Sequence, residues 1–293
     1  MIEELTSHSQ GAIPVIAAFF LLLGLEILRP LRRPKRALKR RVPVNLALTF
    51  MSFAVGVATV RPAALAGAAW AGANSFGLLP YLGWLGLPSW GCFLLGFLLM
   101  DLTFYYWHRA NHVYPLLWRF HNVHHVDPDL DVTTSFRFHF GEVLYSTAFR
   151  LLQVGLIGVS PAIYVAYELA FNLETMFHHS NVRLPLPLER ALNLIIVTPR
   201  MHGIHHSVMG PETNSNFAVI FRWWDLVHRT LRLNVRSRDI IIGVPGYLLP
   251  KDNRTGRLLL QPLARQRPYW RWPSGKTPVR AQAEVANPRI LLA

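Results

Sequence analysis

The sequence predicts an all-α fold, in which a polytopic transmembrane helical bundle carries a histidine-rich cap on its cytoplasmic side. Three observations predict it. Apolar residues make up 52% of the 293 residues and charged residues only 16%, whereas a soluble domain carries about 25% charged residues. Several apolar runs are long enough to cross a bilayer. Finally, the basic residues are concentrated in a few segments and the histidines in a few others.

The expected helices follow the apolar runs of the chain. Three runs have the length of a short spanning helix, about 17 residues or more, and they cover residues 11–28, 44–60 and 91–107. A fourth region, residues 143–177, contains two apolar halves that meet at Ser160-Pro161, which predicts the tip of a helical hairpin. Residues 61–88 are rich in alanine, glycine and aromatic residues, and they could form a further short or re-entrant membrane element. About four to five spans are expected.

The distribution of charge predicts the orientation of these spans. Between Arg29 and Arg41 eight of thirteen residues are basic, but between Pro62 and Trp107 there is no Lys or Arg. Short basic loops stay in the cytoplasm, and counting spans from residues 29–41 places every histidine-rich segment on that same side. The net charge of +14 fits an anionic membrane surface. A nucleic-acid partner is not expected, because such proteins rarely carry apolar runs of spanning length.

Two further features limit the alternatives. Cys92 is the only cysteine, so the chain has no intramolecular disulfide and no multi-thiolate zinc site. The first apolar run follows Glu3 and Glu4 rather than a basic segment, and no small-residue cleavage site comes after it. A cleavable signal sequence is therefore not expected.

Eight of the thirteen histidines lie in three short motifs, which we call the histidine motifs. They are His108-Arg109-Ala110-Asn111-His112, His121-Asn122-Val123-His124-His125 and His202-Gly203-Ile204-His205-His206. Residues three and four apart share a helix face, so the histidines of each motif would point the same way. Neutral imidazole binds iron, zinc, copper and nickel. Because eight imidazoles exceed the roughly four ligands of one zinc ion, the motifs predict a site for two metal ions.

Other kinds of metal site do not fit the sequence. A zincin protease needs His-Glu-x-x-His, and no histidine here is followed by glutamate. Bundle-type di-iron proteins use Glu-x-x-His, which does not occur either. A membrane cytochrome would hold its haem within the spans, whereas these motifs lie just beyond the span ends.

The three motifs, in this order, resemble the fatty acid hydroxylase and sterol desaturase superfamily of membrane non-haem di-iron enzymes. Three flanking stretches are similar to that family as well: Pro199-Arg200-Met201, Glu212 to Phe217, and Trp224-Asp225 followed by Arg229-Thr230. His228 departs from the pattern, which often has an aromatic residue there. The resemblance covers roughly residues 97–230.

The resemblance implies an oxidoreductase with two iron ions, for which zinc could substitute. With O2 it would hydroxylate or desaturate a lipid-like substrate: a fatty acyl chain, a sterol or hopanoid, an ether lipid or a carotenoid. No residue decides between these substrates or outcomes. The chain has no evident flavin, nicotinamide or haem attachment motif, so electrons would come from a separate protein, of the ferredoxin type or of the cytochrome b5 type with its reductase.

The resemblance also gives the expected site residues. The expected metal ligands are His108, His112, His121, His124, His125, His179, His202, His205 and His206. His178, beside His179, is a weaker candidate, and His139 could be a ligand, an orienting partner or a substrate contact. Asp101, Glu142 and Asp225 are further candidate ligands or partners, because metal-bound histidines donate their second N–H to a carboxylate or carbonyl. Asp127, Asp131 and Glu174 are the other acids near the motifs.

These expectations divide the chain into three regions. Residues 1–90 would form a transmembrane region with the basic cytoplasmic loop 29–41, residues 91–235 the hydroxylase-like catalytic region, and residues 236–293 a basic, partly disordered cytoplasmic extension. Two other classes of function stay open. One is a zinc-dependent membrane hydrolase, and the other is a non-catalytic metal-binding membrane protein.

Overall fold

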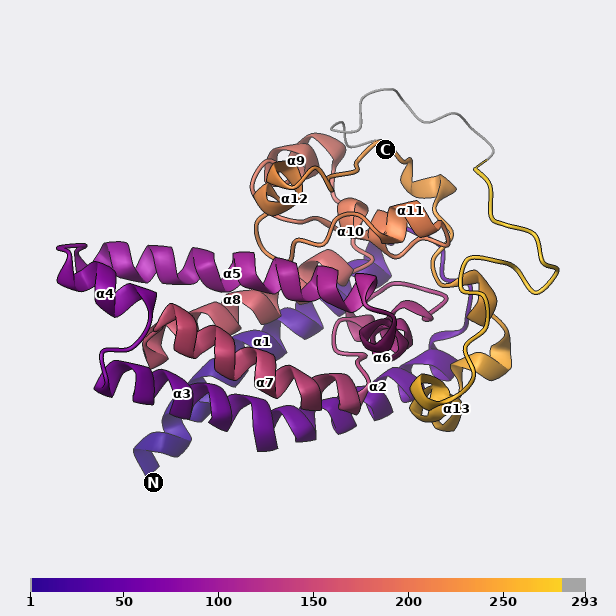
Figure 1. Cartoon of the computed structure of the whole chain (residues 1–293). Coiled ribbons are helices and arrows are strands. Elements are labelled where there is room, and N and C mark those ends of the chain that lie inside the picture. The colour runs from indigo at the N-terminus through magenta and orange to yellow at the C-terminus, as the bar shows by residue number, and fades with distance from the viewer. Residues whose placement is uncertain (1, 281–293) are drawn as a thin grey trace.

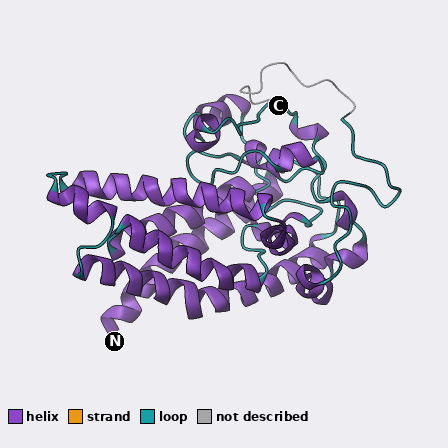
Figure 2. Ribbon diagram, viewed as in Figure 1, coloured by secondary structure: helices purple, strands orange, loops and turns teal. Residues whose placement is uncertain are grey.

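The computed structural model of the chain describes residues 2–280, with the backbone alone for residues 2–11. The described part consists of helices and loops and contains no strand, which confirms the all-α class for these residues (Figure 2). The long helices lie side by side in a bundle (Figure 1). They are α1 (Ile2–Leu28), α2 (Leu38–Val55), α3 (Arg61–Ala73), α5 (Ser89–Val113), α7 (Phe140–Ile157) and α8 (Pro161–His179).

Shorter helices gather at one end of this bundle and form the cap (Figure 1). They are α6 (Pro115–His125), α9 (Leu186–Leu192), α10 (Pro199–His205), α11 (Gly210–Thr213), α12 (Trp223–Val227) and α13 (Thr255–Leu260). The remaining helix, α4 (Leu78–Trp84), lies at the opposite end. The bundle therefore has one end that carries the cap and one end that is closed by short turns.

Within the bundle, α7 packs against α2, α3 and α5, and α8 packs against α1 and α5. A π-helical turn, Gly56–Val60, joins α2 to α3. The predicted hairpin tip is confirmed, because α7 ends at Ile157 and α8 begins at Pro161. Residues 61–88, left open by the sequence, form α3, a turn and α4.

Two glycines make the close approach at this tip possible. Gly77 and Gly158 have φ angles of 106° and 73°, which glycine adopts without steric cost. A Cβ atom on Gly77 would stand 2.6 Å from the Cα atom of Gly158. The turn before α4 therefore lies directly on the end of α7.

Two helical segments are long and apolar enough to cross a membrane: Leu38–Trp84 and Ser89–Val113. The apolar part of α1, Ala12–Leu28, is shorter. Large apolar side chains on the bundle face outward, such as Phe50, which is 74% exposed, and Trp84 at the far end, which is 80% exposed. Such a surface fits lipid, and tryptophan is common at membrane interfaces. The predicted four to five spans and their orientation stay predictions.

The basic segment 29–41, whose last residues form the first turn of α2, docks on the cap. Arg41 is only 3% exposed and donates from Nε and Nη2 to the two carboxylate oxygens of Asp127, at 2.9 Å each. Its Nη1 lies 2.5 Å from Asp131. Arg137 Nη1 lies 3.4 Å from Oδ2 of Asp127. Asp127 and Asp131, two of the acids near the histidine motifs, are thus partners of arginines.

The C-terminal segment also packs on the cap. The rings of Tyr269 and Trp270 lie 5.8 and 5.9 Å from that of Trp118 on α6, and Arg280 forms an ion pair with the buried Glu212. Residues 281–293 lie outside the described part, so the expected disorder of the extension stays a prediction.

We expect Arg41→Ala to destabilise the protein by about 3 kcal/mol, because it leaves Asp127 and Asp131 buried with less compensating charge. Thermal unfolding in detergent, followed by circular dichroism, measures the change. Arg40→Ala is the matched control, since Arg40 is exposed and its removal should leave the melting temperature nearly unchanged. Equal melting temperatures for the two variants would show that the buried ion pairs do not stabilise the fold.

Candidate metal centre

Nine histidines converge at the end of the bundle that carries the cap, in two groups of buried side chains. The first group is His108, His112, His121, His125 and His205, and the second is His124, His179, His202 and His206. Within each group, one nitrogen of every ring lies within 4.8 Å of the others. These nine are the residues expected above as metal ligands. They come from α5, α6, α8 and the α10 segment, which are far apart in sequence.

The two groups are interleaved along the chain. His121 and His125 belong to the first group, but His124 between them belongs to the second. In the α10 segment, His202 and His206 belong to the second group and His205 to the first. The expectation that all three histidines of such a motif point the same way was therefore too simple. Relative to residue i, residue i+4 lies about 40° to one side of the helix and residue i+3 about 60° to the other.

The second group has the spacing of ligands around one ion. The Nε2 atom of His179 lies 3.0 Å from that of His124 and 3.0 Å from that of His202. The Nε2 atoms of His202 and His206 are 3.1 Å apart. Two nitrogens that bind one ion at about 2.1 Å and at right angles stand roughly 3 Å apart. The ring nitrogens therefore surround a point at which a metal ion fits.

Four of the rings are oriented by hydrogen bonds from Nδ1. The pairs are His108 with Phe217 O, His205 with Ser215 O and His179 with Thr175 O at 2.7 Å each, and His121 with Glu142 Oε1 at 2.8 Å. Because each acceptor is a carbonyl or carboxylate oxygen, Nδ1 donates and Nε2 keeps its lone pair. This is the arrangement expected around metal-bound imidazole.

The inner nitrogens of the first group have no protein partner within the described part of the chain. The Nε2 atoms of His112, His121, His125 and His205 are buried and form no hydrogen bond. An unsatisfied buried polar atom costs about 1–3 kcal/mol. A metal ion bound at this point would satisfy all of them at once, so the residues present fit a metal.

Burial also keeps these rings in the form that binds metal. It lowers the pKa of His179 and that of His205 from 6.5 to about 3. The same cause, together with neighbouring histidines, lowers the pKa values of further histidines of the two groups well below 6.5; these are His124, His125, His202 and His206. These six imidazoles are therefore neutral at physiological pH, as metal binding requires.

Asp225 orients histidines without touching them. Its carboxylate accepts hydrogen bonds from the backbone N–H groups of Phe217 and Ala218 at 2.8 and 2.9 Å, and from the Thr230 hydroxyl at 2.6 Å. These bonds fix the segment 215–218, whose carbonyl groups hold the rings of His108 and His205. Asp225 therefore acts through the backbone.

Asp101 fixes the next part of the same loop. It accepts hydrogen bonds from the Trp224 indole N–H at 2.8 Å and from the Phe221 backbone N–H at 3.0 Å. Of the three acids singled out in the sequence, only Glu142 contacts a histidine of either group, and none is part of a group. Asp101 thus ties α5 to the cap and acts as a packing partner.

His139 and His178 lie outside both groups. His139 precedes α7, where its Nδ1 accepts a hydrogen bond from the Gly141 N–H at 2.9 Å, and its Nε2 lies 3.1 Å from Leu259 O. Both of its nitrogens are thus in use. The ring of His178 lies against that of His202, with the centroids 4.1 Å apart and the ring planes tilted by 47°.

Two contacts of the site were not expected from sequence. The ring of Trp118 lies 4.9 Å from that of His112 and covers the first group. Arg32 lies over Gly203, where a Cβ atom would stand 2.5 Å from its Nη2, and donates to Pro199 O at 3.2 Å. The glycine inside the third motif, Gly203, was the only available sequence signal for the second contact.

Comparison with known proteins agrees with this geometry. Residues 93–230 match the family model for fatty acid hydroxylase, which confirms the resemblance seen in the histidine motifs. The chain is similar to an ornithine lipid hydroxylase of Rhizobium tropici, with 30% identity over 153 residues, 52% of this chain and 45% of the relative. It is also similar to human cholesterol 25-hydroxylase, with 28% identity over 138 residues, 46% and 49% of the two chains.

A third relative is human alkylglycerol monooxygenase, with 31% identity over 150 residues, 50% of this chain and 32% of the relative. The chain thus spans between about a third and a half of the length of the curated relatives it matches. No solved structure matches it.

We expect each histidine group to bind its own ion. Iron-loaded wild-type protein should then hold about two ions per chain, and His125→Ala or His206→Ala should each lower this to about one. Metal analysis of protein purified without oxygen measures the ratio. His139→Ala, whose ring is outside both groups, is the matched control and should keep both ions. A single ion in the wild-type protein would contradict a two-ion centre.

We also expect stability to fall on acidification. Below pH 6.5 the unfolded chain takes up protons at histidines such as His179 and His205, whose folded-state pKa is about 3. Each such group reduces the free energy of unfolding by up to about 1.4 kcal/mol per pH unit in that range. Burial raises the pKa of Asp225 to about 6, which acts in the opposite direction, but the histidines are more numerous. Chemical denaturation with a chelator present measures the slope, and a flat profile between pH 6.5 and 4 would contradict it.

Proposed function

Because residues 93–230 carry the fatty acid hydroxylase pattern, we propose that this chain is a membrane-bound oxygenase with two iron ions and a lipid-like substrate. The observation that carries the proposal is the pair of adjacent histidine groups, five rings and four, buried together. Nine imidazoles are more than one ion can use. The activities named for the three relatives, all hydroxylases or monooxygenases, support it.

Each group has the composition of a site for an ion of intermediate softness. Imidazole alone does not choose iron over zinc, so the preference for iron rests on the family. Two iron ions at these positions would supply the activation of O2 that oxidation of an unactivated C–H bond needs. The product carries either a new hydroxyl group or a new double bond.

The chain itself supplies position and a dry environment. The carbonyl groups of Phe217, Ser215 and Thr175 and the carboxylate of Glu142 hold four rings with Nε2 inward. Aromatic rings cover both groups: Trp118 lies beside His112, and Phe138 stacks on His124 with centroids 4.7 Å apart. Such packing limits the access of water.

The substrate is proposed to reach the site from the bilayer. His108 and His112 lie on the last turns of α5, which is one of the two helices that could cross a membrane. A molecule dissolved in the lipid around the bundle could therefore reach the site without entering water. The relatives are named for an ornithine lipid, cholesterol and an alkylglycerol, and we propose a substrate of this general class.

Electrons are proposed to come from a separate protein on the cytoplasmic side. The net charge of +14 would attract an acidic carrier, such as a ferredoxin or a cytochrome b5 with its reductase, by electrostatic steering. The multi-pass topology with the cap in the cytoplasm is part of the same proposal. Protease added to sealed inside-out vesicles tests this placement: it should digest a cytoplasmic cap, whereas a cap on the other side would be protected.

The reaction is tested by lipid analysis of cells that express the chain, grown under oxygen labelled with the heavy isotope. We expect a lipid product that carries label from O2, or a desaturated lipid that forms only with O2, and a loss of at least about 100-fold in His112→Ala. His139→Ala should keep the activity. A product that also forms without O2, by a zinc-containing protein, would instead indicate a metal-dependent hydrolase.

A further inference from the structure

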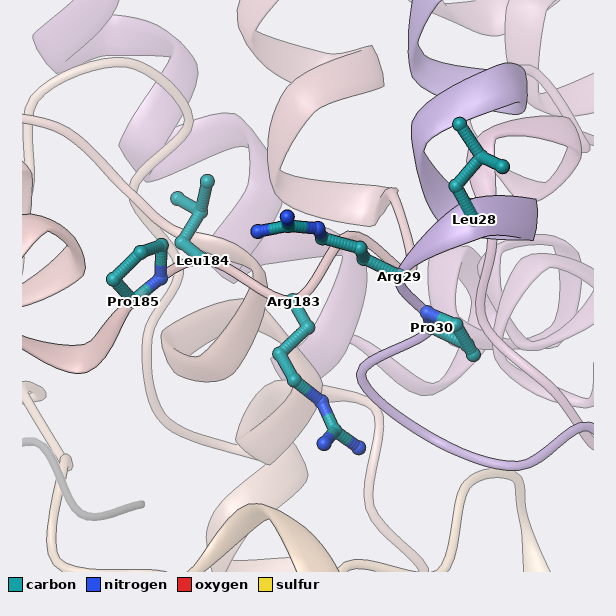
Figure 3. Close-up of a pocket in the computed structure, with 6 residues that line it drawn as sticks. All are labelled: Leu28, Arg29, Pro30, Arg183, Leu184 and Pro185. Atoms are coloured by element: carbon teal, nitrogen blue, oxygen red, sulfur yellow. The ribbon is translucent and has the colours of Figure 1, made fainter.

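A pocket outside the metal centre lies between the end of α1 and the segment that precedes α9 (Figure 3). Its volume is about 440 Å³, within the usual range of small-molecule sites. The lining residues are Leu28, Arg29, Pro30, Arg183, Leu184 and Pro185. Two arginines thus meet four apolar residues in one depression of the surface.

The backbone holds the two arginines together. The Arg183 N–H donates to Arg29 O at 2.8 Å, and the Leu31 N–H donates to Asn181 O at 2.7 Å. The two segments therefore run antiparallel, with a bridge between Pro30 and Val182. This pairing is made by main-chain groups, and the guanidinium group of Arg183 adds only one long contact, from Nη2 to Leu31 O at 3.5 Å.

The surroundings of the pocket are strongly basic. Neither Arg29 nor Arg183 forms an ion pair with a carboxylate of the described residues, and both side chains are exposed. The neighbouring Arg200 pairs with Glu189 and donates to Leu184 O, in the pocket lining, at 3.2 Å. Burial, and to a lesser extent the charge of Arg183, lowers the pKa of Arg200. Positive charge is therefore in excess here, and an anion would relieve the repulsion.

The pocket also stands where the apolar surface of α1 ends. Ile27 and Leu28 are 62% and 78% exposed, and Arg29 follows them directly. If α1 lies in the bilayer, its last apolar turn meets the acyl chains and Arg29 stands at the level of the headgroups. A ligand with an anionic head and apolar tails would match both parts of this surface.

We propose that this pocket binds the phosphate group of an anionic membrane phospholipid, with Arg29 and Arg183 on the phosphate and the acyl chains along Ile27 and Leu28. The guanidinium group matches phosphate geometry through paired N–H donors. The site rests on the proposed membrane placement of α1, but it is independent of the metal centre. The lipid is bound as a boundary lipid and is not the substrate of the oxidation.

The test uses full-length protein purified in a non-ionic detergent. Phosphatidylglycerol, phosphatidylcholine with the same acyl chains, or inorganic phosphate is added, and bound lipid is counted by native mass spectrometry alongside the melting temperature. We expect phosphatidylglycerol to be retained and to raise the melting temperature more than the other two. Arg29→Gln with Arg183→Gln should weaken its binding roughly tenfold or more.

The matched control is Arg257→Gln with Arg271→Gln, which removes the same charge from exposed positions elsewhere on the cap. It should bind phosphatidylglycerol as the wild type does. An equal loss of phosphatidylglycerol binding in both double variants would show that overall charge causes the effect, and it would overturn the proposed site. Equal protection by inorganic phosphate would overturn the lipid assignment. Metal content and product formation are not among these readouts, so failure here and failure of the proposed oxygenase are distinguishable.

Discussion

The structure depends on one constraint: nine imidazoles are buried together, and in the first group the inner nitrogens of four rings have no hydrogen-bond partner among the described residues. Carbonyl and carboxylate oxygens satisfy the outer nitrogens of four rings, as with His108 and Phe217, but within the first group the Nε2 atoms of rings such as His125 are left without a partner. A core of this kind is costly unless something else fills it. The fold therefore makes physical sense as the shell of a metal centre.

This constraint explains the polar network around the centre. A ring held in one orientation needs a fixed acceptor, and a fixed acceptor on a loop needs an anchor of its own. Asp225 anchors the segment 215–218 through two backbone N–H groups, and Asp101 ties the following residues to α5. Few acids are present in this chain, and these two, both fully buried, serve the backbone rather than the metal.

The sequence predicted the helical class and the hairpin tip at Ser160-Pro161, because both depend on local spacing. The histidine motifs predicted a shared site for eight histidines, and only the family resemblance added His179 to them. The sequence did not predict that His124 and His125 would belong to different groups. Residues on one helix face still differ in direction, so they can point to two neighbouring ions. The sequence left His139 ambiguous, because its capping contact with Gly141 depends on where α7 begins. The pairing of Arg41 with Asp127 joins residues 86 positions apart, and no local pattern indicates such a contact.

The burial of Arg41 has a consequence for how this protein can be studied. The orientation of a membrane protein is usually tested by replacing basic residues next to an apolar run with neutral ones. Here one of those residues, Arg41 on α2, also binds Asp127 of the cap. Its removal would therefore disturb folding and insertion together. Only the exposed arginines of the same segment, such as Arg33 and Arg40, are suitable probes of insertion alone.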